Sequence, residues 1–555
     1  MVSALPDPWD RRESSVALHR PFLDVPPFPG RRFHRFARLR QLSEPPVTLR
    51  ECLALLREKR VGGAYWARQP AVPSSYLLVR STAAAASCAQ LVKEHGDLLL
   101  WLAAPSSVPS TVPTIVGQCD PWHMLGNARA LVCDAGDDLR LVAAILDVPT
   151  YLMDSSGGRP RRWEGKLDDL LADALPVDGC FSNPFGEDAL NLVELIELCG
   201  FWRSLIDSNR VIGNGVGFAF WKQDRVTPLL WSGGETAGFF DSSAAGQRGA
   251  VAIWRSKAPP DLVEKLESRG TALVEVEDGF LRSDGLGADC VPPLSITVDR
   301  LGPYFDPCQP SELENLLQFG EFPQPLLERA GRLRATIVAA GLGKYERSDA
   351  VLKRFDANRR HVLVAGQVED DRSILTGGGG LVANLELLQR VRARAPDSFL
   401  IYKPHPDVEA GHRKGNIPEN IARQYCDLII TDASISSLIA MVDEIHVNTS
   451  LAGFEALMRH KDVTTYGVPF YAGWGLTRDL GPVPARRTSK RSLDELVAAS
   501  LLMYPRYLDP VTGLPCPAEV IVDRLCAGMA SRNGLLVSAR RLQGKLKRRL
   551  QWLAR

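Results

Sequence analysis

Short apolar runs alternate with segments of helical periodicity along most of this chain, and no other feature constrains its fold as strongly. The runs are 76–79, 98–102, 130–132, 150–153, 251–254, 273–276, 361–365, 399–402, 428–430, 444–447 and 463–466. Runs of this length, separated by helical patterns, predict buried strands joined by crossover helices, which together form a parallel sheet. The chain is therefore expected to belong to the α/β class.

The grouping of these runs predicts how the 555 residues divide into domains. We expect an N-terminal α/β region over 1–205, a Rossmann-like domain over 206–350, a second one over 351–530, and a tail over 531–555. Two Rossmann-like domains facing a cleft are the arrangement of many glycosyltransferases, although a fold alone does not give a function. The N-terminal region echoes the later part of the chain only weakly. It is either a degenerate half of a duplicated module or a convergent α/β unit.

Composition argues against several classes of protein. The formal net charge of +1 gives no bulk field that would attract nucleic acid. The eleven cysteines form no Cys-x-x-Cys pair and no zinc spacing, so we expect reduced cysteines, no metal and no cofactor. The first residues lack the apolar core of a secretory signal, and no stretch reaches the ~20 apolar residues of a membrane span. We therefore expect a cytoplasmic protein.

The last residues, from Ser538 onward, have a different character. Leu542, Leu546, Leu550 and Leu553 recur at helical spacing among Lys and Arg, with no acidic residue. Such a helix can lie on an anionic membrane, with each basic residue adding on the order of 1 kcal/mol. The alternative is a terminal helix that packs its leucines on its own domain. Membrane contact would make the protein a peripheral membrane protein.

Two adjacent carboxylates, Glu277 and Asp278, follow the apolar run 273–276, and Gly279 and Arg282 come next. Ligands gather at the carboxyl ends of strands in open α/β sheets, and glycine allows close approach of the backbone. The paired acids suit acid–base chemistry. The alternative is a helix-capping aspartate with a surface ion pair.

A second strand end, at 366–373, contains Gln367 and three consecutive acids that end at Asp371. Three carboxylates in a row cannot all be buried without partners, so one of them is a candidate nucleophile or base. The alternative is a solvated acidic loop.

Two further segments suit a phosphate group. Lys403 and His405 lie in a Lys-Pro-His-Pro sequence at a strand end, where they offer a point charge and a proton carrier. Thr449 or Ser450 is expected to cap a helix whose first N–H groups bind phosphate, and Glu455 could accept ribose hydroxyls. The alternative is an ordinary capped helix.

The aromatic and glycine-rich segment 466–477 contains Tyr471 and Trp474. It could stack on a base or close over a sugar, or it could instead plug the interface between two domains.

In this order and spacing, these segments resemble the KpsC-like capsular polysaccharide β-Kdo transferases. The resemblance covers about 210–530, and it is most specific in 366–373, 403–408, 450–457 and 466–477. It implies a pair of GT-B-type Rossmann domains, and a metal-independent enzyme that transfers Kdo from CMP-Kdo to a lipid-linked saccharide acceptor. It also implies retention of configuration, and a place in capsular polysaccharide biosynthesis and transport at the cytoplasmic face of a Gram-negative inner membrane.

The resemblance also assigns roles to residues. It implies that Asp371 is the nucleophile, which a retaining double displacement requires, and that His405 lies beside the donor phosphate. Glu277 or Asp278 would be the acid/base, with a slight preference for Glu277. The residues expected to bind the nucleotide sugar are Gln367, Lys403, His405, Ser450, Gly453 and Glu455. The residues expected on the acceptor side or in the cleft are Arg282, Tyr471 and Trp474.

The N-terminal region departs from this pattern, because it contains no counterpart of Glu-Asp-Gly-Phe or Lys-Pro-His-Pro. Two other functions are therefore kept open. One is a GT-B transferase that uses another CMP- or UDP-sugar. The other is a non-catalytic capsule assembly or export factor, against which the intact carboxylates at 277, 278 and 371 argue.

Overall fold

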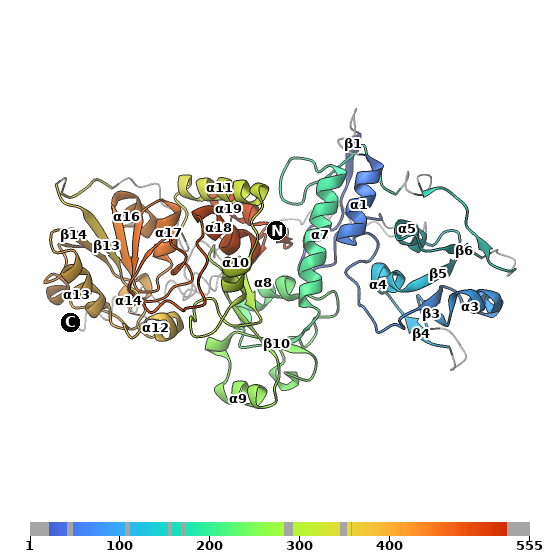
Figure 1. Ribbon diagram of the computed structural model, residues 1–555, viewed down its shortest axis with the longest axis horizontal. Helices are drawn as coiled ribbons and strands as arrows, with labels where there is room; N and C mark the ends of the chain where they lie inside the picture. Colours follow the sequence, from blue (N-terminus) through green and yellow to red (C-terminus); the bar gives the residue numbers. More distant parts are fainter. Residues whose placement is uncertain are drawn as a thin grey trace, which may run out of the picture. The chain divides into compact units, whose positions relative to one another are not determined.

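The computed structural model describes residues 21–41, 48–105, 112–153, 158–167, 170, 174–281, 292–343, 352–356, 358–411 and 413–529. The predicted tail and Arg282 lie outside these residues. The chain forms two compact units (Figure 1). One consists of residues 1–27 and 34–207, and the other of residues 28–33 and 208–555.

The first unit is built on a six-stranded sheet in the order β4-β3-β2-β5-β6-β7. Its strands are β2 (Tyr76–Val79), β3 (Leu98–Leu102), β4 (Thr114–Val116), β5 (Ala128–Cys133), β6 (Thr150–Leu152) and β7 (Arg161–Arg162). All neighbours are parallel except β6 and β7. The four apolar runs predicted as strands in this region are therefore confirmed.

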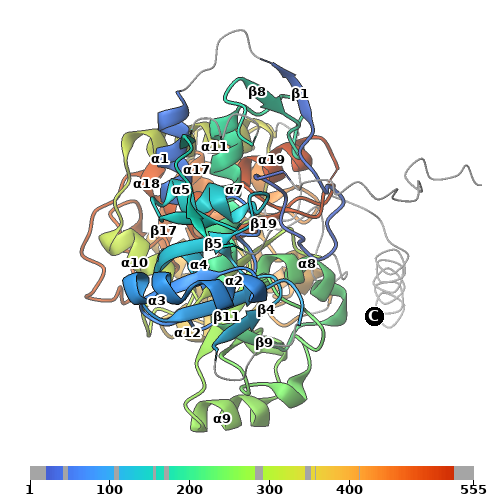
Figure 2. The ribbon, with the colours of Figure 1, turned by 90° about the vertical axis from the view of Figure 1, so that its right-hand side faces the viewer.

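Helices cover this sheet because its strands are apolar on both faces. They are α2 (Thr82–Ser87), α3 (Ala89–His95), α4 (Pro121–Gly126) and α5 (Leu139–Ile145), and α2 and α3 lie against β2 (Figure 2). The unit also contains α1 (Leu49–Lys59), α7 (Leu192–Asn209) and a small antiparallel pair of β1 (Arg38–Gln41) with β8 (Gly179–Phe181).

The second unit contains two sheets, each of which forms the centre of a lobe. The sheet of the first lobe has the order β20-β19-β12-β11-β10-β9. Its strands are β9 (Ile212–Val216), β10 (Ala250–Ile253), β11 (Leu273–Asp278), β12 (Ser295–Asp299), β19 (Pro505–Leu508) and β20 (Pro515–Cys516). The first three run parallel, and the last three pair antiparallel. Around it lie α8 (Phe220–Leu230), α9 (Pro260–Ser268), α10 (Glu312–Phe319) and α11 (Gln324–Ala339).

The sheet of the second lobe is entirely parallel, in the order β15-β14-β13-β16-β17-β18. Its strands are β13 (His361–Ala365), β14 (Phe399–Lys403), β15 (Leu428–Ile429), β16 (Glu444–Val447), β17 (Asp462–Thr465) and β18 (Arg478–Asp479). In chain order this is 3-2-1-4-5-6, the strand order of the Rossmann fold. The chain adds β14 and β15 on one side of β13 and then crosses to the other side to add β16. The strand order therefore reverses between β13 and β16, and the carboxyl ends of these two strands are the expected ligand site.

Six helices connect the strands of the second lobe: α12 (Arg372–Gly377), α13 (Asn384–Arg394), α14 (Pro406–Glu409), α15 (Glu419–Ala422), α16 (Ile435–Met441) and α17 (Ala452–Met458). Its core includes Val362, Val364, Leu388 and Leu400. The sheet of the first unit has the same 3-2-1-4-5-6 order. Because this order is common among doubly wound sheets, it fits duplication and convergence equally well.

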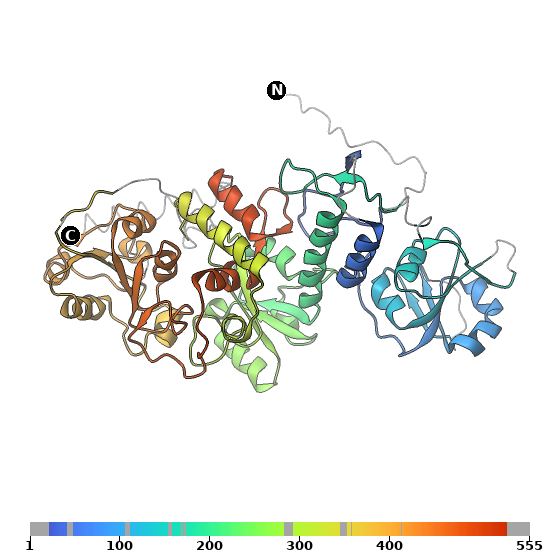
Figure 3. The ribbon, with the colours of Figure 1, turned by 45° about the horizontal axis from the view of Figure 1, so that its top comes forward.

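The last described segment, which the prediction included in the domain 351–530, joins the sheet of the first lobe instead. The second lobe ends with β18, and the chain then returns to the first lobe through α18 (Leu493–Val497) and a π-helical turn at Ala498–Met503. β19 pairs with β12, and α19 (Ala518–Cys526) lies beside α11 (Figure 3). β12 would otherwise be an unpaired edge strand, and its pairing with β19 satisfies the backbone groups of that edge.

Across the described part of the chain, no helix combines the length and the apolar character that crossing a bilayer requires.

Candidate functional site

A cavity of about 460 Å³ lies between the two lobes of the second unit. The second lobe contributes the residues that follow β13, β14 and β16, so the cavity opens at the topological switch point of the Rossmann sheet. The first lobe contributes Glu277 and Asp278, the last two residues of β11, together with Tyr304 and Phe305. Four predicted segments, from distant parts of the sequence, therefore meet around one cavity.

Gln367 lies at the switch point itself. Its backbone N–H donates to Asn384 Oδ1 (2.9 Å), and its Oε1 accepts from the N–H of Thr449 (3.4 Å), so it joins the ends of β13 and β16. The Nε2 of Gln367 and the hydroxyl of Thr449 are both buried, and neither has a hydrogen-bond partner among the described residues. Buried polar groups are nearly always satisfied, so these two cavity residues are suited to bind a polar ligand.

The three consecutive carboxylates have three different environments. Glu369 accepts a hydrogen bond from the N–H of Asn384, the first residue of α13, and Asp370 pairs with Arg413 at 3.1 Å. Asp371 caps α12, because its Oδ1 accepts from the N–H (3.0 Å) and the hydroxyl (2.8 Å) of Ser373. Of the three, only Asp371 lines the cavity.

Lys403 and His405 line the cavity next to this loop. Lys403 is the last residue of β14, and its buried ammonium group donates to the carbonyl of Thr431. His405 Nδ1 accepts from the N–H of Asp407 at 3.2 Å, so in the neutral ring the proton resides on Nε2. That tautomer allows Nε2 to donate a hydrogen bond to an anionic group.

The segment after β16 brings Thr449, Ser450 and the buried Glu455 to the cavity. The helix begins later than predicted, at Ala452, and the hydroxyl of Ser450 accepts from the N–H of Ala452 at 3.3 Å. Gly453 is not among the residues that line the cavity, and its role in binding the nucleotide sugar stays a prediction. A side chain there would collide with the hydroxyl of Tyr471, so this position is kept small by packing.

Tyr471 and Trp474 were expected in the cleft, and the structure corrects that expectation. Both side chains are fully buried, and neither lines the cavity. The hydroxyl of Tyr471 donates to the carbonyl of Ser450, and the indole N–H of Trp474 donates to the carbonyl of Phe470 (2.8 Å). Of the two interpretations of this segment, the interior plug is therefore the one that the packing supports.

Glu277 faces the second lobe across the cavity. Its Oε1 lies 3.1 Å from the guanidinium of Arg372, the residue that follows Asp371. Burial raises the pKa of Glu277 to about 8; the charge of Arg372 opposes this rise, and those of Asp278 and Glu275 add to it. A carboxyl group with a pKa in this range can exchange a proton near neutral pH.

Asp278 has a different partner. Its Oδ1 lies 3.3 Å from the ammonium group of Lys222 on α8, and that group lies 3.3 Å from the ring centre of Trp254. Lys222 is itself buried, so a buried cation with an aromatic neighbour compensates the charge of Asp278. The two adjacent acids are therefore held in distinct electrostatic environments.

Several residues that line the cavity, or that pair with residues lining it, were not predicted from the sequence. Arg372 lay inside a recognised segment, but nothing in its spacing distinguished it from the acids beside it. Tyr304 and Phe305 form an aromatic pair after β12, which is a weak signal, and Lys222 gave none. Within the described residues, no group of His, Cys, Asp and Glu side chains has an arrangement that could hold a metal ion.

Comparison with known proteins adds an independent line of evidence. A family model described as "Capsule polysaccharide biosynthesis protein" matches residues 249–351 and 334–507. The capsule polysaccharide modification protein LipA of Neisseria meningitidis is 36% identical over 371 residues, which are 66% of this chain and 52% of LipA. The lipopolysaccharide-processing protein LpsZ of Rhizobium meliloti is 50% identical over 253 residues, 45% of this chain and 57% of LpsZ.

Among solved structures, the β-Kdo 2,4 transferase KpsC of Thermosulfurimonas dismutans is 36% identical, with a TM-score of 0.45, over 50% of this chain and 87% of that one. The chain spans about half the length of the curated relatives that it matches. The family match includes the strands and loops that build the cavity, from β11 to the segment after β17. The chain thus belongs to the family of capsule polysaccharide biosynthesis proteins.

Proposed function

We propose that this chain is a retaining glycosyltransferase that moves Kdo from CMP-Kdo to a lipid-linked saccharide acceptor in capsular polysaccharide biosynthesis. One observation carries the proposal: Asp371 and Glu277 line the same cavity from opposite lobes, at the switch point of a Rossmann sheet. The choice of Kdo as the sugar rests on the motifs that resemble those of the β-Kdo transferases.

The donor is expected to bind against the second lobe. Lys403 and the Nε2 of His405 offer positive charge and a hydrogen-bond donor to the phosphate of CMP, while Gln367 and Thr449 offer unsatisfied polar groups. Glu455 is a buried carboxylate on the same wall, suited to accept the ribose hydroxyls. Fixed donors aimed at a leaving phosphate stabilise the charge that develops there.

The reaction would proceed in two displacements. In the first, a carboxylate oxygen of Asp371 forms a bond to the anomeric carbon, and the bond from that carbon to the phosphate oxygen breaks with its electrons, releasing CMP. In the second, the acceptor hydroxyl gives its proton to Glu277 and its oxygen bonds to the anomeric carbon. The bond to Asp371 then breaks and restores the carboxylate. Two inversions give net retention.

The test uses the purified full chain with CMP-Kdo generated in situ and a fluorescent lipid acceptor that ends in Kdo. Wild type should transfer Kdo, and intact-mass measurement without acceptor should detect a Kdo adduct that is absent from Asp371→Asn. Parallel reactions with other CMP- and UDP-sugars distinguish the alternative donors. Failure to transfer any of these sugars, or transfer at the wild-type rate by Asp371→Asn, would contradict the proposal.

We also propose peripheral association with the cytoplasmic face of the inner membrane through the basic tail, which lies outside the described residues. Sedimentation with anionic vesicles, with and without the residues after Ser538, tests this association. Equal sedimentation of the two proteins would refute it.

A further inference from the structure

Arg372 joins the two walls of the cavity. It is the first residue of α12, on the second lobe, yet its guanidinium lies 3.1 Å from Glu277 Oε1 and 3.8 Å from Glu275 Oε2, both on β11 of the first lobe. Its Cζ also lies 5.1 Å from the ring centre of Phe305, which follows β12. One side chain from the donor side thus contacts three residues of the opposite lobe.

Other charged groups around Glu277 come from several elements. On its own strand, Asp278 and Glu275 are negative, and Lys222 on α8 is positive. Lys222 forms an ion pair with Asp278, and Arg255 forms one with Glu275. Arg372 is therefore the cation that contacts Glu277 directly among these groups, and it arrives from the other lobe.

Building on the function proposed above, we propose that Arg372 is a positioning residue that orients Glu277 and favours its ionised form, which accepts the proton of the acceptor hydroxyl. An opposite charge within hydrogen-bond distance favours the carboxylate over the acid. Because Arg372 follows Asp371, the start of α12 fixes both the nucleophile of the first displacement and the cation that prepares the base for the second.

This arrangement would make the acceptor step depend on the two lobes being together. If the lobes separate, the guanidinium leaves Glu277, and the carboxyl loses the contact that orients it and the positive charge that favours its ionised form. If the lobes are closed around the donor, Glu277 becomes available as a base. An acceptor would then be activated only after the donor side is in place.

The experiment separates the two displacements in Arg372→Gln, Arg372→Lys and, as a control for loss of one positive charge on the same lobe, Arg390→Gln. Arg390 lies on α13 in an exposed pair with Glu386. In Arg372→Gln, formation of the Kdo adduct without acceptor should stay within about threefold of wild type. Transfer to acceptor should fall about 10-fold or more near pH 7, since the pH at which the rate is half maximal rises by about one unit or more.

Raising the pH should restore transfer by Arg372→Gln, and Arg372→Lys should retain part of it, because lysine keeps the charge but not the planar fork. The double variant Arg372→Gln/Glu277→Gln should be no slower than Glu277→Gln alone, since residues that act through one another are not additive. Arg390→Gln should match wild type.

Three results would overturn this role for Arg372 while leaving the proposed function intact. They are an unshifted pH profile in Arg372→Gln, equal losses of adduct formation and transfer, or additive losses in the double variant. An inactive wild-type protein that forms no adduct would instead refute the proposed function.

Discussion

At the scale of single residues, the two carboxylates that end β11 show how neighbours acquire different chemistry. Successive side chains of a strand point to opposite faces, so Glu277 and Asp278 meet different surroundings. Asp278 meets Lys222 within its own lobe, whereas Glu277 meets Arg372 across the cavity. The sequence offered both residues as the acid/base, and the raised pKa of Glu277 favours Glu277.

Glu277 should control the pH dependence of transfer. The ionised form is the base, so kcat/KM for the acceptor should rise as the pH increases through about 8, the pKa of Glu277. Glu277→Gln should remove this limb and lower transfer by about 10²–10⁴-fold. Rate measurements between pH 6 and 10 check this, and a limb that persists unchanged in Glu277→Gln would assign it to another group.

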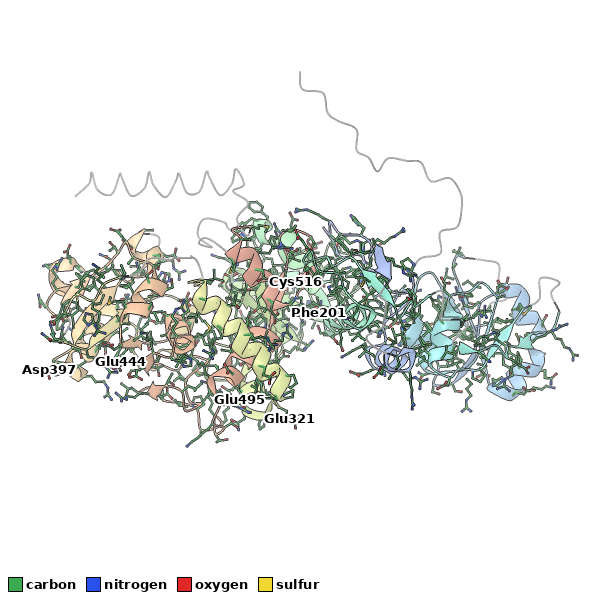
Figure 4. The ribbon with its side chains drawn as sticks, turned by 90° about the horizontal axis from the view of Figure 1, so that it is seen from above. Phe201, Glu321, Asp397, Glu444, Glu495 and Cys516 are labelled. Carbon is green, nitrogen blue, oxygen red and sulfur yellow. The ribbon has the colours of Figure 1, made fainter. Side chains whose placement is uncertain are left out.

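A second titrating group lies inside the second lobe, away from the cavity. Glu444, which is labelled in Figure 4, lies on β16 and accepts hydrogen bonds from His446 (2.9 Å) and Thr464 (2.9 Å). Although burial acts to raise it, these bonds and the charge of Arg360 hold the pKa of Glu444 at about 2. The folded state therefore binds this proton less tightly than the unfolded chain, whose carboxyl titrates near the ordinary value of 4.5.

The consequence is a stability contribution that depends on pH. It is present above about pH 4.5 and is lost as the pH falls toward 2, and it amounts to at most about 3 kcal/mol. Glu444→Gln should therefore lower the melting temperature at pH 7, and the difference from wild type should shrink in acid. Thermal melts from pH 7 to 3 measure this, with the exposed Glu386→Gln as control. A difference that stays constant with pH would contradict the assignment.

At the scale of elements, Asp371 has two roles, and a substitution by alanine would remove both at once. It caps α12 through Ser373, and it is the proposed nucleophile. Capping explains why an aspartate can be partly buried at this strand end. Its oxygen accepts a hydrogen bond from an N–H group at the start of the helix, which has no partner within the helix. Sequence reasoning considered capping for the acids near 277 but not for Asp371, since α12 is short, lacks clear periodicity and runs directly into the glycine-rich stretch 377–380.

The two roles can be separated by substitution. Asn caps helices about as well as Asp, so Asp371→Asn should keep the wild-type melting temperature and still lose adduct formation. Asp371→Ala should lose the adduct and also about 1 kcal/mol of stability. Ser492→Ala, which removes the cap of α18, should cost similar stability and leave the adduct unaffected. If Asp371→Asn forms the adduct, Asp371 is not the nucleophile.

The aromatic segment after β17 is one whose position the sequence pattern alone does not predict. Aromatic residues among glycines occur both in loops that cover ligands and in interior plugs, and the two cannot be distinguished by composition. Tyr471 is buried because its ring fills the space that Gly453 leaves open and its hydroxyl reaches the carbonyl of Ser450. Phe470, the residue before it, is the one that lines the cavity.

At the scale of the whole molecule, segments from both ends of the described chain complete the second unit. Residues 28–33 interrupt the first unit in sequence but belong to the second. Phe28 is buried edge-on against Trp231 at 5.0 Å, and the N–H of Arg32 donates to the carbonyl of Thr512 (2.6 Å). The first lobe is thus assembled from residues about 500 positions apart, which slows its formation relative to local elements.

Phe28→Ala should therefore destabilise the second unit, although residue 28 lies between two segments of the first unit in sequence. Loss of a buried phenylalanine costs about 3–5 kcal/mol. Hydrogen exchange should speed up in β19 and β20 and leave the sheet of the first unit unchanged. Phe22→Ala is the matched control: Phe22 packs on Gly62 inside the first unit, and its loss should affect that unit instead. Identical exchange patterns for the two variants would contradict the assignment of residues 28–33.

The sequence by itself determined the α/β class, the strands at 76–79, 98–102, 273–276, 361–365 and 444–447, and the segments that gather at their carboxyl ends. Most of these follow from local apolar patterning, because a strand buried on both faces reads as a largely apolar run, although 273–276 contains Glu275 and 444–447 contains Glu444 and His446. The tertiary structure alone decided which carboxylate has the raised pKa, that Arg372 reaches it, that Tyr471 and Trp474 are interior, and that the chain returns to the first lobe. Each of these depends on neighbours far apart in the sequence, and burial and charge at such contacts exist only once the lobes have assembled.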